Sequence, residues 1–151
     1  MNTSTLYRTA NSAFVPTKIS FISRRESPLI PFENNPVVYF QKIDNLLNDK
    51  NGDYDAEFLI PSLSAIAKMK SLIKSLHQVF GEKLSAIKFI PNGKGGIEAM
   101  IRNKEKLLHL VVPADKYKSP YLFQKEGFDY GIKQFSELEE LENWFSWVLS
   151  K

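Results

Sequence analysis

His77 and His109 are the only imidazoles in a chain of 151 residues that has no cysteine. Acid–base, nucleophilic or metal chemistry would need one of them beside a carboxylate, a hydroxyl or a second ligand at motif spacing. Neither has such a neighbour, since His77 falls late in an amphipathic stretch and His109 lies within an apolar run. We therefore predict no catalytic residue, no metal site and no cofactor. A small enzyme of unknown substrate, with a pocket around His109, is kept as the third of three hypotheses.

A glycine-rich stretch, Asn92-Gly93-Lys94-Gly95-Gly96, is the one motif that resembles a phosphate-binding loop. A phosphate loop reads G-x-x-x-x-G-K-[ST] and lies between a strand and a helix. This stretch lacks the Ser or Thr and separates two runs with strand character. It therefore predicts a hairpin turn.

Basic side chains are concentrated in the middle of the chain. The net charge is −1 for residues 1–60, +7 for residues 61–118 and −3 for residues 119–151, within a total of +3. Clustered Lys and Arg are what contacts to nucleic-acid phosphates require. A nucleic-acid-binding module is therefore the second hypothesis, against the simpler interpretation of a solvated surface. Its candidate anion-binding residues are Lys68, Lys70, Lys74, Lys88, Lys94 and Arg102.

The stretch from residue 84 to 135 organises the predicted fold. Short apolar, β-branched and aromatic runs alternate in it with Gly, Pro, Asn and Asp, a pattern typical of an antiparallel meander. Residues 107–112 are apolar on both faces except for His109, as expected of a central strand. The aromatic residues of the last two runs, at 121–123 and 128–132, alternate along the chain. We expect them to lie chiefly in the core.

Helices are predicted on either side of this meander. From residue 62 to 80, apolar residues recur every three or four positions, and Gly81 follows. Near the end of the chain, Ser136 and Glu139 form the spacing of a capping box ahead of a second helix. The prediction is an α+β fold: an antiparallel sheet of about four to six strands with helices packed mainly on one face.

The first 35 residues are predicted to form an extended arm and a proline-pinned connector ahead of a single domain at residues 36–151. Proline fixes φ and removes a backbone donor, so Pro28, Pro31 and Pro36 favour an extended connector over a helix there, while Asn35-Pro36 can start a helix at the beginning of the domain. The first hypothesis is a non-catalytic protein-binding or accessory subunit, antitoxin-like, immunity-like or an assembly factor, that binds a protein partner or forms a homo-oligomer. The arm is expected to contribute part of the interface. Its candidate partner-binding residues are Phe14, Ile19, Phe21, Leu29, Ile30 and Phe32.

Several features follow one another along the chain: the predicted helix of residues 62–80, the run Ile90-Pro91-Asn92-Gly93-Lys94-Gly95-Gly96-Ile97-Glu98, two further strands and a C-terminal acidic helix with Trp. In these features residues 62–149 resemble a group of small uncharacterised bacterial α+β proteins. The aromatic residue usual after Gly-Gly-Ile is replaced here by Ala99-Met100. The resemblance implies the same fold class and no particular activity.

Composition is that of a globular protein, with 43% hydrophobic and 25% charged residues. No apolar run approaches the roughly 20 residues of a membrane span, so no membrane association is expected. The lack of cysteine fits a reducing compartment and predicts a cytoplasmic protein. The first 25 residues lack acidic residues and are rich in Arg, Ser and Thr, which keeps organelle targeting as an alternative.

Overall fold

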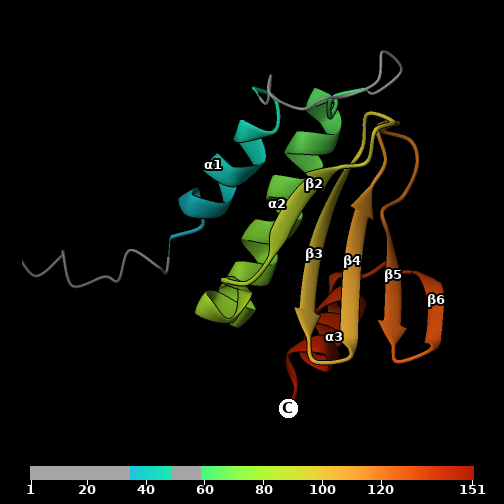
Figure 1. The fold of residues 1–151 in the computed structure, drawn as a ribbon. Coiled ribbons are helices and arrows are strands. Elements are labelled where there is room, and N and C mark those ends of the chain that lie inside the picture. Colours follow the sequence, from blue (N-terminus) through green and yellow to red (C-terminus); the bar gives the residue numbers. More distant parts are fainter. Residues whose placement is uncertain (1–34, 49–58) are drawn as a thin grey trace, which may run out of the picture. The chain divides into compact units, whose positions relative to one another are not determined.

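The computed structural model describes residues 35–48 and 59–151, and the chain divides into two units, Met1–Asn35 and Pro36–Lys151. The second unit, in its described residues, has an α+β fold, as predicted, with three α-helices and one five-stranded antiparallel sheet (Figure 1). Its elements in chain order are α1 (Val37–Asn45), α2 (Leu63–Phe80), the 3-10 helix η4 (Gly81–Leu84), β2 (Lys88–Pro91), β3 (Ile97–Asn103), β4 (Lys106–Val112), β5 (Tyr121–Glu126), β6 (Asp129–Gln134) and α3 (Leu138–Leu149).

The sheet is a meander in which each strand pairs with its neighbour in sequence, in the order β2-β3-β4-β5-β6. The predicted central strand is therefore β4. Two-residue loops connect β3 to β4 and β5 to β6. In the second loop Gly127 has a φ of +61°, which a two-residue hairpin turn beginning with glycine requires. The glycine-rich stretch is a longer hairpin loop between β2 and β3, as predicted.

One face of the sheet is covered by helices. Helices α2 and α3 both contact β3 and β4, and α1 packs against α2. Alternate residues of the strands point into this layer, because successive side chains of a strand face opposite sides. The buried residues that β2, β3, β4 and β5 contribute to this core are Phe89, Ile97, Ala99, Ile101, Leu108, Leu110, Val112 and Leu122.

Helix α2 begins and ends where the sequence predicts. The Ser62 side chain accepts a hydrogen bond from the backbone N–H of Ala65 at 3.2 Å, which satisfies one of the free donors of the first turn. At the other end Gly81 has a positive φ of +53°. Between them, the middle of the predicted apolar stripe is buried, with Met69 and Ile73 fully enclosed, whereas its first residue, Leu63, is exposed. The prediction of this helix is confirmed.

The start of α3 differs from the predicted capping box. The helix begins at Leu138, with Glu137 as N-cap residue, and no side chain caps it. The side chain that accepts a hydrogen bond from the Ser136 N–H is that of Glu140 instead of Glu139, with Oε1 at 3.1 Å. Glu140 lies one full turn beyond Ser136, so its carboxylate returns over that N–H.

Side chains of the β3–β4 hairpin donate hydrogen bonds to the backbone carbonyl groups at the C-terminal end of α3. The last carbonyls of a helix have no partner within it. Here Asn103 Nδ2 donates to the carbonyl oxygens of Val148 and Ser150, both at 2.9 Å, and Lys106 Nζ donates to that of Trp147 at 3.0 Å. The Lys106 ammonium also lies 5.6 Å from the centre of the Trp147 ring. These contacts fix the end of α3 on the sheet.

Candidate functional site

The face of the sheet opposite α2 and α3, which we call the open face, has no helix over it among the described residues. Three rows of cross-strand neighbours make it up, because directly opposed residues share a face. The central row runs from Met100 through His109 and Phe123 to Ile132. The outer rows are Glu98, Val111, Tyr121 and Gln134 on one side, and Arg102, Leu107, Lys125 and Tyr130 on the other.

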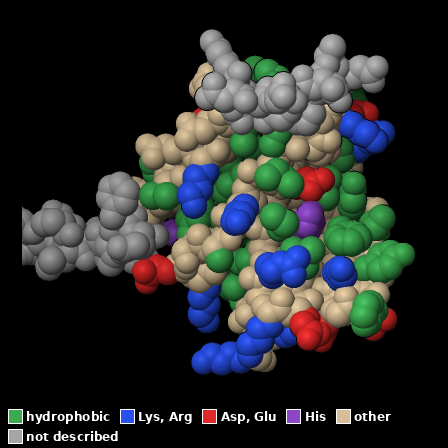
Figure 2. Space-filling model, viewed as in Figure 1, with side chains coloured by type: hydrophobic (Ala, Val, Ile, Leu, Met, Phe, Trp, Pro, Cys, Tyr) green, Lys and Arg blue, Asp and Glu red, His purple; other side chains and the backbone are tan. Residues whose placement is uncertain are grey.

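Large apolar side chains are exposed on this face and at its edge. Tyr130 and Ile132 of β6 are 71% and 65% exposed, and Phe128 in the β5–β6 loop is 100% exposed. The Phe123 and Tyr130 rings are in contact, with centroids 6.2 Å apart. Figure 2 shows hydrophobic side chains gathered over β5 and β6. Contiguous exposed apolar surface of this kind marks interaction sites in soluble proteins.

The prediction that these aromatic residues lie chiefly in the core is wrong. The described helices lie over β3 and β4 on the other side of the sheet from these side chains, so the alternating aromatic residues of β5 and β6 point away from the core. In β5 the fully buried residue is Leu122, which faces the helices. The alternation of side chains along the strands correctly indicated that the sheet has two different faces. It did not indicate which of the two faces the helices cover.

Cationic side chains border the apolar part of the open face. Arg102 and Lys125 lie on either side of Leu107 in one cross-strand row, and Lys88 lies opposite Met100 on the edge strand β2. All three basic side chains are exposed. The open face is therefore an apolar surface with a positively charged border (Figure 2).

His109 and Glu98 form a pair near the centre of this face. Nδ1 of His109 lies 3.0 Å from Oε1 of Glu98, and the two side chains are 20% and 22% exposed. The His109 ring also meets Phe123 edge-on, at 5.7 Å between centroids. The residues directly opposite His109 are Met100 and Phe123, neither of which can act as a nucleophile. The pair orients the imidazole on the face and is not part of a nucleophilic triad with its direct neighbours.

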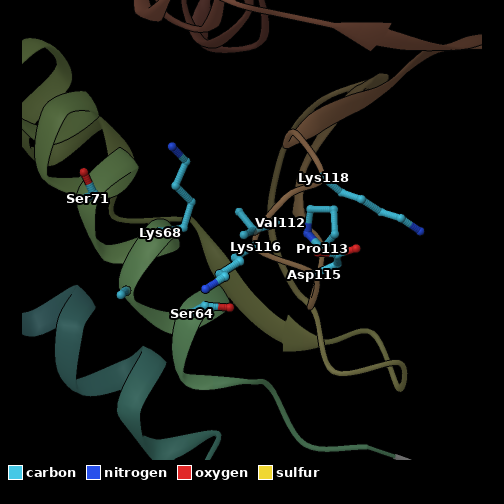
Figure 3. Close-up of a pocket in the computed structure, with 9 residues that line it drawn as sticks. Ser64, Lys68, Ser71, Val112, Pro113, Asp115, Lys116 and Lys118 are labelled. Carbon is cyan, nitrogen blue, oxygen red and sulfur yellow. The ribbon is translucent and has the colours of Figure 1, made fainter.

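A hollow of about 390 Å³ lies between α2 and the β4–β5 loop. Ser64, Lys68 and Ser71 line it from α2, and Lys116 lines it from the loop. Figure 3 shows the Lys68 side chain rising between α2 and the strands, and Lys116 reaching from the loop toward α2. The hydroxyls of Ser62 and Ser64 each donate to the Ala114 carbonyl at 3.1 Å, which ties the loop to the start of α2. Cations and hydroxyls from two elements therefore border one hollow.

A second hollow of about 350 Å³ lies on the other side of the same loop. It is lined by Lys94 from the β2–β3 loop, Tyr121 from β5 and Lys118. Lys118 and Asp115 border both hollows, and Figure 3 shows Lys118 extending away from Lys68. The β4–β5 loop thus separates two hollows, each with lysine side chains at its border.

The six basic residues predicted for anion binding do not form one surface. Lys68 lines the first hollow and Lys94 the second. Lys70 is engaged by α1, since its Nζ lies 2.7 Å from Asp44 Oδ1 and 5.7 Å from the centre of the Phe40 ring. Lys74 is an exposed residue of α2, and Lys88 and Arg102 belong to the open face.

The predicted partner-binding residues of the arm, Phe14, Ile19, Phe21, Leu29, Ile30 and Phe32, lie outside the described residues. Their role stays a prediction.

Sequence reasoning missed the Glu98–His109 pair and the lysines of the β4–β5 loop. The pair could have been found from hairpin register, because a two-residue loop at 104–105 places residue 98 diagonally across from residue 109. Lys116 and Lys118 carry no such signal, since their neighbours come from α2 and the β2–β3 loop, far away in sequence.

In the described part of the chain, no three His, Asp or Glu side chains are grouped so that they could hold a metal ion. None of the helices found there has the length and apolar character needed to cross a membrane. Comparison with protein families, with curated proteins and with solved structures gives no match for this chain.

Proposed function

We propose that the chain is a non-catalytic protein-binding or accessory subunit and that the open face is its main interface. The observation that carries the proposal is the exposure of Phe128, Tyr130 and Ile132 beside a cationic border. The partner that fits is a protein whose apolar surface is bordered by carboxylates, which would lie against Lys88 and Arg102.

The apolar residues supply affinity and the cations supply selectivity in this arrangement. Full burial of a large apolar side chain is worth about 1.5–3 kcal/mol, so burying three exposed residues gives a useful driving force. Charges at an interface border act mainly on the association rate and on the choice of partner. The arm of residues 1–35 enters the proposal as a predicted second part of the interface.

The test is capture of a partner by the tagged chain from a lysate of the organism that encodes it. Ile132→Lys should lower recovery of the specific partner at least tenfold, because an ammonium would have to be buried against apolar surface. The matched control is Leu63→Lys, which makes the same change at a 77% exposed position of α2. Leu63→Lys should capture as the wild type does, and both variants should keep the wild-type far-UV circular dichroism.

The opposite pattern would refute the proposal. If Ile132→Lys recovers the same proteins in the same amounts as the wild type, the open face is not the interface. A tagged chain that starts at residue 36 tests the arm separately and is expected to bind the partner more weakly.

A second candidate function, binding of a nucleic-acid strand, is favoured by the two hollows beside the β4–β5 loop. Lys68 and Lys116 border one hollow and Lys94 and Lys118 border the other, so phosphates on both sides of the loop could be contacted. Tyr117, at the exposed tip of the loop, offers an aromatic surface for a base.

This candidate predicts salt-dependent binding of a fluorescent single-stranded oligonucleotide, measured by anisotropy. Each lost phosphate contact lowers the slope of log affinity against log salt by about 0.7 for a single strand. Lys68→Glu combined with Lys116→Glu should therefore weaken binding and flatten the slope. Lys74→Glu with Lys83→Glu changes the net charge equally and is the control. It should weaken binding less and change the salt slope less. Equal effects of the two pairs would show only a general dependence on net charge.

A further inference from the structure

The sheet has two edge strands, β2 and β6, and the outer edge of β6 has no strand paired with it among the described residues. The opposite edge strand, β2, has four residues and ends in Pro91, two features that prevent further strand pairing. Strand β6 has six residues and no proline, and all but Gly131 are exposed. An edge of this kind is a template for a further strand.

We infer that β6 pairs antiparallel with β6 of a second copy of this chain, about a two-fold axis through Gly131. This inference concerns the strand edge and stands independently of what the open face binds. The axis places Asp129 of each copy opposite Lys133 of the other, and Tyr130 of each opposite Ile132 of the other. The strand sequence is thus complementary to itself in charge and in apolar character.

The hydrogen-bonding pattern of β6 allows this register. The pair Glu126 and Asp129 closes a two-residue loop, and such a closing pair is hydrogen-bonded. Backbone groups of Asp129, Gly131 and Lys133 therefore point toward β5, and those of Tyr130 and Ile132 point outward. In the proposed register the outward residues face each other, so four backbone hydrogen bonds form across the axis.

Other registers fit less well. A shift of one residue would pair open-face residues of one copy with helix-side residues of the other, so the two open faces would lie on opposite sides of the joint sheet. A shift of two residues in either direction sets Asp129 or Lys133 opposite Gly131 of the second copy, and both ion pairs are lost. At the proposed axis the two Gly131 residues have no side chains to collide.

The resulting dimer would have a continuous ten-stranded sheet. Tyr130 and Ile132 of both copies lie at its centre on the open side, since directly opposed residues share a face. Dimerisation would thus partly cover the two most exposed apolar side chains in the strands of that face and join the two open faces.

Sedimentation equilibrium of the full chain provides the test. The wild type should show a mass near twice the 17.3 kDa of one chain at micromolar to millimolar concentration. Lys133→Asp should raise the dissociation constant at least tenfold, because Asp129 then faces a carboxylate on both sides of the axis. The double variant Asp129→Lys with Lys133→Asp restores opposite charges and should restore the dimer.

Cross-linking tests the register. The chain has no cysteine, so Gly131→Cys introduces one thiol per copy, and the axis places the two within disulfide distance. This variant should form a covalent dimer on air oxidation, whereas Lys74→Cys on α2 should not. A wild type that stays monomeric throughout, or a dimer that Lys133→Asp leaves as stable as the wild type, would overturn the inference. A monomeric wild type whose partner capture is lost in Ile132→Lys would overturn it and leave the proposed function standing.

Discussion

Phe145→Ala is expected to lower the free energy of unfolding by about 3–5 kcal/mol, the usual range for removing a large side chain from a closed core. Phe145 is fully buried in α3, and its ring lies 6.2 Å from that of Phe80 at the end of α2. Both helices would border the cavity, so neither can collapse into it without leaving the sheet. Urea denaturation followed by circular dichroism measures the change.

The control for this variant lies two residues earlier in the same helix. Asn143 is exposed, and its replacement by Ala should change the unfolding free energy by less than about 0.5 kcal/mol. If Phe145→Ala proved as mild as Asn143→Ala, the packing of α3 against α2 and the sheet described above would be wrong.

Gly96→Ala is expected to destabilise the protein by about 2–4 kcal/mol, from overpacking combined with lost hydrogen bonds. A Cβ at this position would lie 2.6 Å from the Val112 carbonyl oxygen and 2.6 Å from Asn92 Nδ2. Asn92 is not free to move away, because its Oδ1 accepts from the backbone N–H groups of Lys94 and Gly96, both at 2.9 Å. The β2–β3 loop would have to separate from β4.

Gly131→Ala is the matched control, since the nearest atom to its new Cβ is Gln124 Nε2 at 3.4 Å. Thermal unfolding should show a clear loss of stability for Gly96→Ala and a small change for Gly131→Ala. Equal stability of the two variants would mean that the glycine is not needed for the close approach of the loop to β4.

Most of the fold was predictable because its signals are local. Helix α2 carries its own cap at Ser62 and its own apolar stripe, and short loops of two to eight residues between successive strands favour pairing in sequence order. The start of α3 was placed incorrectly because the Ser136–Glu139 spacing favours Ser136 as the N-cap residue, whereas the helix has Glu137 in that position. The carboxylate that accepts from the Ser136 N–H in three dimensions is that of Glu140.

The candidate interface was not predictable, because it depends on which face of the sheet the helices cover. Tyr121, Phe123 and Tyr130 alternate as core residues do, and alternation is the same for a covered and an uncovered face. The basic residues show the same limit. Lys68 and Lys70 are two positions apart in one helix, yet the first borders a hollow and the second is paired with Asp44.

The strands follow one another in the sheet in the same order as in the chain, and this affects the rate at which the sheet forms. Each of the four pairings from β2 to β6 closes a loop of eight residues or fewer, so little chain entropy is lost at any step. Sheets built from such short-range pairings form faster than sheets that join distant segments. The outer edge of β6 takes no part in these four pairings. Pairing with a second copy would be the fifth step of the same series, and the first whose rate depends on protein concentration.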